Sequence, residues 1–108
     1  MSGPGSDSDG GGGGIEDDVS CDALHFRTSL NSPDPTVVGT LAKGDVLKLE
    51  QRNVNGPLLA VTNASKIAGS VAGVLLINLL RCMGAGHKYN ATVLNVTGGN
   101  IEVEIRHV

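Results

Sequence analysis

The stretch KIAGSVAGVLLINLLRCMGAG, residues 66–86, decides the fold that the sequence predicts. Its apolar residues recur at the i, i+3, i+4 and i+7 spacing of a helix. On a helical wheel they cover more than half of the circumference, and Ser70, Asn78 and Arg81 form a narrow polar edge. We expect Ser70 to cap the amino end and Gly84 to end the helix in the left-handed conformation. The pattern predicts one long buried helix.

A transmembrane helix is the alternative interpretation of this stretch. Such a helix needs about 20 predominantly apolar residues, whereas three polar side chains and flanking glycines interrupt this run. The sequence therefore favours a helix buried in a protein core and predicts no membrane association.

Short apolar segments on both sides of this stretch predict β-strands. In each, apolar residues alternate with polar ones or form a brief continuous run. These segments are residues 24–28, 45–51, 58–62, 87–97 and 101–108. A further short strand ahead of the long helix would bring the number to six.

The last two strands form the clearest hairpin in the sequence. Gly98, Gly99 and Asn100 supply the turn, and Ile101, Val103 and Ile105 alternate with charged residues. We expect this apolar face to pack on the long helix.

A short helix is predicted between the first two strands. Asp34 is its expected N-cap and Pro35 its first residue, and it extends to Ala42 before Gly44. The fold class is α+β, a small curved antiparallel sheet or β-barrel of about six strands with one long buried helix and one short helix.

Composition divides the chain into two parts. Residues 1–18, MSGPGSDSDGGGGGIEDD, are rich in Gly, Ser and Asp, and we expect a disordered tail because they have little apolar surface to bury. Residues 19–108 are predicted to form a single small α+β domain.

Charge and cysteine content limit the classes of function. The chain of 108 residues carries a net charge of −3, which gives no electrostatic reason for binding nucleic acid or an anionic membrane. Cys21 and Cys82 lack metal-ligand and CxxC spacing, and Cys82 on the apolar helix face is predicted to be a small buried hydrophobe. With no signal peptide visible, we expect a cytoplasmic protein.

The sequence contains no recognisable catalytic or metal-binding motif. His25, His87 and His107 would bind a metal only if the fold brought all three together, and no HxH or HExxH spacing supports this. Asp45 follows Gly44, where an aspartate commonly binds nearby amides. We therefore predict no catalytic residue, no cofactor, no metal and no enzymatic activity.

The spacing of several segments resembles that of HIRAN domains. These segments are GDVLKL at 44–49, LLAV at 58–61, IAG at 67–69, the helix, and GHKYNATV at 86–93. HIRAN domains are small β-barrel modules that bind DNA ends, so the resemblance implies a barrel-like binding module. The more specific family motif is reduced to NVNGP at 53–57, and Ser70 replaces the family aromatic, so no DNA-contacting residue is carried over.

The first functional hypothesis is a non-catalytic module that binds a protein partner or forms a homodimer. Val74 and Ile77 lie outside the arc that a sheet would cover, next to the edge that carries Asn78 and Arg81, and this mixture is typical of an interface. The competing interpretation is that the short helix covers Val74 and Ile77 within one chain.

The alternative function is HIRAN-like binding of single-stranded nucleic-acid ends. Its candidate contacts are Tyr89, Lys88, Lys66 and Arg106, which would supply one aromatic ring and three cations.

Overall fold

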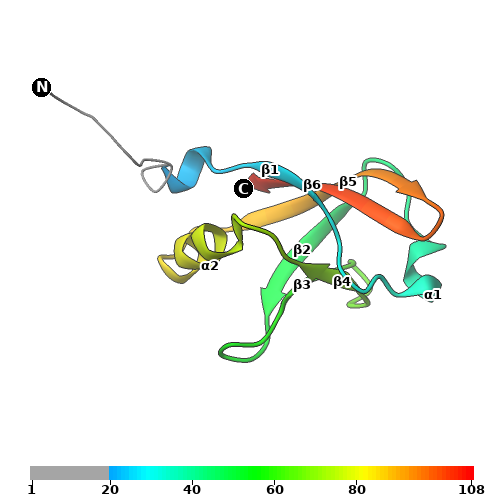
Figure 1. The fold of residues 1–108 in the computed structure, drawn as a ribbon, viewed down its shortest axis with the longest axis horizontal. Helices are drawn as coiled ribbons and strands as arrows, with labels where there is room; N and C mark the ends of the chain where they lie inside the picture. The colour runs from blue at the N-terminus through cyan, green and yellow to red at the C-terminus, as the bar shows by residue number, and fades with distance from the viewer. Residues whose placement is uncertain (1–19) are drawn as a thin grey trace, which may run out of the picture.

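The computed structural model describes residues 20–108, which form a six-stranded antiparallel sheet curled into a half-barrel, with two α-helices (Figure 1). The strands lie in the order β1-β6-β5-β2-β3-β4. A 3₁₀ turn at Cys21–Ala23 comes first; the elements that follow are β1 (Phe26–Ser29), α1 (Pro35–Val38), β2 (Val46–Gln51), β3 (Leu58–Val61), β4 (Ile67–Val71), α2 (Leu76–Gly84), β5 (Tyr89–Thr97) and β6 (Asn100–His107). The predicted α+β class, with about six strands and two helices, is confirmed. The expected tail, residues 1–18, lies outside the described residues.

The hairpin of β5 and β6 is confirmed at the predicted turn. Gly98 and Gly99 have φ angles of 57° and 86°, which glycine adopts without the steric cost that a side chain would bring. Thr97 pairs with Asn100 across the turn. Ile101, Val103 and Ile105 are fully buried in one core cluster that also contains Leu79 of α2; these four residues place the core on the inner face of the sheet.

The single long helix predicted for residues 66–86 is wrong in its first half. Residues Ile67–Val71 form β4, which pairs with β3, and Gly73 then takes a φ of 111° before α2 begins at Leu76. Pairing with β3 satisfies backbone groups of β4, and three of its five residues are buried, which outweighs the helical spacing of its sequence. Ser70 is therefore a strand residue and caps no helix.

The carboxyl end of α2 also differs from the prediction. Gly84 is the last helical residue, Ala85 is the C-cap, and the left-handed conformation falls on Gly86, with a φ of 103°. The turn that redirects the chain into β5 therefore lies two residues later than expected.

The two outer strands of the sheet meet at one point. Asn31, just beyond β1, exchanges two backbone hydrogen bonds with Ser70 of β4, at 2.8 and 3.0 Å. This approach needs a glycine at position 69, because a Cβ there would lie 2.9 Å from the carbonyl oxygen of Asn31. The curled sheet is thus fastened at the end of β1, and its two edges separate from there.

The short helix α1 begins as predicted and ends earlier. The Asp34 carboxylate accepts a hydrogen bond from the Thr36 amide at 2.9 Å, and Pro35 is the first helical residue. The helix ends at Val38 rather than Ala42. Asp45 accepts a hydrogen bond from the Ala42 amide at 2.9 Å, which confirms its predicted structural role.

Helix α2 is held to the domain by a disulfide bond between Cys82 and Cys21, whose Cα atoms are 5.6 Å apart. Cys82 is buried as predicted, but it is not simply a small hydrophobe, because the fold brings together two cysteines 61 positions apart and they are bonded. The cytoplasmic location was expected because no signal peptide is visible, and it stays a prediction. A disulfide bond does not favour it, since disulfides persist mainly in oxidising compartments. Between Ser20 and Val108, no helix is both long and apolar enough to cross a membrane.

Candidate functional site

The turn before α2 and the first turn of α2 carry an exposed apolar surface. Val74 is 93% exposed and Ile77 is 69% exposed. Asn78 is half-buried and Arg81 is exposed beside them. We call Val74, Ile77, Asn78 and Arg81 the α2 patch.

Helix α1 leaves the α2 patch uncovered. Helix α1 contacts β4 and lies at the opposite end of the molecule from α2 (Figure 1). The competing interpretation, in which α1 covers Val74 and Ile77 within one chain, is therefore wrong.

The α2 patch continues into the gap between the two sheet edges. Beyond the Asn31–Ser70 bridge, β1 and the chain that follows β4 separate around a hollow of about 120 Å³. It is lined by Phe26, Arg27 and Thr28 on one side and by residues 72–75 on the other. Val74 belongs to both surfaces, so the apolar region extends from α2 toward β1.

The four candidate nucleic-acid contacts do not form one surface. Lys66, Lys88 and Arg106 line three different hollows, and Arg106 is 3.6 Å from the carboxylate of Glu104. Tyr89 is only 3% exposed, so its ring is not available for stacking on a base.

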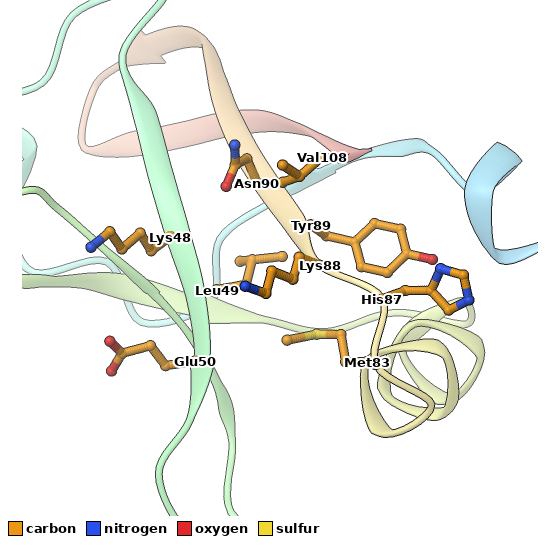
Figure 2. A pocket seen from close by; sticks show the side chains of 10 residues that line it. Lys48, Leu49, Glu50, Met83, His87, Lys88, Tyr89, Asn90 and Val108 are labelled. Carbon is orange, nitrogen blue, oxygen red and sulfur yellow. The ribbon is translucent and has the colours of Figure 1, made fainter.

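A second hollow, of about 620 Å³, lies where β2 separates from β5 (Figure 2). The pairing of these strands ends at Lys48 and Asn90, because β2 continues alongside β3. Leu49 and Met83 supply apolar surface, and Lys88 lies at its rim. The volume is within the range of small-molecule pockets, about 300 to 1,000 Å³.

Tyr89 is the centre of a buried contact network at the end of this hollow. Its hydroxyl donates a hydrogen bond to the carbonyl oxygen of Cys21, which is itself bonded to Cys82. Burial raises the pKa of Tyr89, and the nearby charge of Asp22 raises it further. The disulfide and this hydrogen bond therefore fasten the segment around Cys21 to both α2 and β5.

Two histidines lie beside this network. His87 Nδ1 is 3.0 Å from His107 Nε2, and the ring of Tyr89 meets that of His107 edge-on, with centroids 5.2 Å apart. The spacing of these residues in the sequence did not indicate a pair. The register of the hairpin does, because Tyr89 lies opposite His107 and His87 is two residues before Tyr89.

Asp22, which follows Cys21 in the sequence, carries a negative charge that acts on Tyr89. A hydrogen bond from Ser20 Oγ lowers the pKa of Asp22, and charges on His107 and His87 lower it further. His25 does not join the pair, since its Nδ1 lies 3.2 Å from the carbonyl oxygen of Ala23. In the part of the chain that the structure describes, no group of three or more His, Cys, Asp or Glu side chains is placed to hold a metal.

Comparison with known proteins gives no relative: no family model, no curated protein and no solved structure matches this chain. Function is therefore argued from the geometry of the described residues.

Proposed function

We propose that this domain is a non-catalytic binding module that associates with a second copy of itself through the α2 patch. The observation that carries the proposal is the exposure of Val74 and Ile77, three positions apart in the turn before α2 and the first turn of α2. Contiguous exposed apolar surface commonly marks a site of protein association.

The free energy of burying these side chains favours association. Covering a Val or Ile side chain fully contributes about 1.5 to 3 kcal/mol. In a two-fold dimer both subunits bury the same side chains, so each position contributes twice. Val54, at 91% exposure, is a contrasting case, because it is a single apolar side chain in the loop between β2 and β3. A lone apolar residue of that kind is normal on a protein surface.

Asn78, the uncharged polar residue of the α2 patch, suits a symmetric pairing. The Asn78 amide carries both donors and acceptors, so two Asn78 side chains related by a two-fold axis can bind each other. Arg81 lies one turn further along α2 and would belong to the polar rim. A two-fold dimer is the commonest closed assembly, and it places the same patch on both subunits.

Light scattering on the native chain and on Ile77→Lys tests the proposal. We expect a dimer at micromolar concentration for the native chain and a folded monomer for Ile77→Lys, because the ammonium group would be buried without a partner. The control is Val54→Lys, which changes an even more exposed apolar residue outside the α2 patch and should remain dimeric. A monomeric native chain, or a dimer that both substitutions leave intact, would contradict the proposal.

Binding of single-stranded nucleic-acid ends is the competing function, and it rests on the resemblance to HIRAN domains. Titration of the protein with a fluorescent single-stranded oligonucleotide that has a free 3′ end separates the two. We expect no salt-sensitive binding, since the cations are dispersed and Tyr89 is buried. Binding that weakens steeply with salt would favour the nucleic-acid function.

A further inference from the structure

His87 and His107 direct ring nitrogens at each other from two different segments of the chain. His87 lies in the connection between α2 and β5, and His107 is the last residue of β6. The distance between His87 Nδ1 and His107 Nε2 is 3.0 Å, and the ring planes are tilted by 59°. Imidazole nitrogen is the commonest protein ligand for transition-metal ions, and here two such nitrogens face each other at a distance that one ion can span.

Both rings are held by contacts that the proposed dimer does not use. The His87 amide donates to the carbonyl oxygen of Cys82 at 3.1 Å, and Cys82 is fixed by the disulfide. The ring of His107 packs edge-on against Tyr89, whose hydroxyl is bound to the carbonyl oxygen of Cys21. The pair is thus preorganised by one network, which lowers the conformational cost of binding an ion.

The separation of the two nitrogens allows one ion to bind both. Two neighbouring ligands at about 2.05 Å from an ion lie about 2.9 Å apart when they subtend a right angle, and about 3.3 Å apart at tetrahedral corners. The observed 3.0 Å lies between these values, and the right angle is that of a square-planar or tetragonal site, which Cu²⁺ and Ni²⁺ prefer.

We propose that His87 and His107 form a two-nitrogen chelate for Cu²⁺, in neighbouring positions of a tetragonal site whose other positions are open to water. Among divalent first-row ions, Cu²⁺ binds nitrogen ligands most strongly. Asp22 lines the same hollow as His107, so its carboxylate favours a cation at this position. The sequence offers no spacing that indicates such a site, since the two ligands are 20 positions apart.

The ordinary alternative is a hydrogen bond between two neutral imidazoles, in which one ring donates its N–H to the other. That arrangement needs a proton on one of the facing nitrogens, whereas Cu²⁺ needs both lone pairs. Binding of the ion therefore requires that ring to change tautomer: its proton moves, by exchange with water, to the other nitrogen of the same ring, and both rings stay neutral.

Electron paramagnetic resonance of the full chain with equimolar CuCl₂ tests the proposal. We expect a tetragonal signal with hyperfine splitting from two nitrogens. His87→Gln and His107→Gln should each lose one nitrogen coupling and weaken Cu²⁺ binding more than tenfold, since losing even an outer-sphere partner costs about 10- to 100-fold. Thermal melts of each variant establish that it is folded.

The matched control is His25→Gln, which removes an exposed histidine outside the pair and should keep both couplings and the native affinity. Titration with ZnCl₂ should give weaker binding at the same two histidines. The proposal is overturned if the native chain shows no nitrogen coupling, if His25→Gln abolishes the signal, or if the His87 and His107 variants bind Cu²⁺ as tightly as the native chain. Since neither histidine belongs to the α2 patch, these results are independent of the oligomeric state.

Discussion

The β5–β6 hairpin and helix α2 are attached to the same core in different ways. The hairpin is a continuous ladder that runs from the Tyr89–His107 pair to the Thr97–Asn100 pair, with an irregularity between Val93 and Asn95. In α2, by contrast, only Leu79 and Cys82 are buried, and Cys82 is held covalently. The hairpin is stabilised by many fully buried side chains. Helix α2 fully buries one leucine and one disulfide-bonded cysteine, and its other core contacts come from the partly buried Leu76, Leu80 and Met83.

The difference explains why the candidate surfaces gather around α2. An element that buries few of its side chains leaves the others free for binding, and α2 has apolar residues exposed at its start and Met83 lining the hollow at its end. The hairpin, which fills the core, has no such freedom. Substitutions that weaken each attachment should therefore differ in size.

The largest effect is expected in the hairpin, from Val103→Asp. Val103 is fully buried, and a carboxylate there would have no partner, at a cost of several kcal/mol. Because a domain of this size has a net stability of about 5 to 15 kcal/mol, we expect loss of the folded state, measured by circular dichroism and thermal melting. Asn95→Asp, which adds a carboxylate at an exposed position of β5, should melt as the native chain does. A native-like melt for Val103→Asp would mean that the core does not lie on this face.

The double substitution Cys21→Ser with Cys82→Ser should have the second largest effect, through α2. A bond between residues 61 positions apart restricts the unfolded chain by about 4 kcal/mol in the loop-entropy model. Urea unfolding of the variant and of the native chain, both without reductant, measures the difference. A loss under about 1 kcal/mol would show that α2 is held mainly by Leu79 and its neighbours, as the hairpin is held by its core.

Tyr89→Phe should have the smallest effect of the three, because it removes one hydrogen bond where the hairpin and the Cys21 segment meet. We expect a loss of about 0.5 to 1.5 kcal/mol at neutral pH. The raised pKa of Tyr89 means that the folded state favours the protonated phenol. Its contribution is therefore complete below the ordinary value of 10.0 and is lost as pH rises through the folded-state pKa.

Melting temperatures at alkaline pH distinguish this contribution from a general effect. The native chain should lose stability above pH 10.0, and Tyr89→Phe should lose less over the same interval. Equal losses in both proteins would show that Tyr89 ionisation is not linked to unfolding.

Local sequence signals predicted the hairpin and α1 well. At Gly98–Gly99 the turn chemistry and the alternation of Ile101, Val103 and Ile105 favour the same structure, so no tertiary contact had to override either. Asp34 and Pro35 likewise specify the start of α1 by a contact within three residues. The length of α1 was overestimated, because the apolar spacing of Val37, Val38 and Leu41 is satisfied by a short turn.

The features that the sequence did not predict depend on contacts between residues far apart in the chain. The sequence of Ile67–Val71 suits a helix as well as a strand, and pairing with β3 decides between them. The disulfide and the His87–His107 pair each join residues at least 20 positions apart. Residues so far apart form no local sequence pattern, so neither contact could be predicted from the sequence. The exposure of Ile77 was anticipated because it depends mainly on the width of the apolar arc of one helix, whereas Val74 is exposed in the turn that precedes α2.

The Cys21–Cys82 bond also determines what happens when the backbone is cut. The loop between β2 and β3 is exposed from Arg52 to Asn55 and lies inside the ring of chain that the disulfide closes. A protease that cleaves after Arg52 would divide the polypeptide into two pieces, and the bond would keep them as one covalent molecule, with β2 still facing β3. The nicked protein would therefore migrate as a single species until a thiol reagent released its two halves.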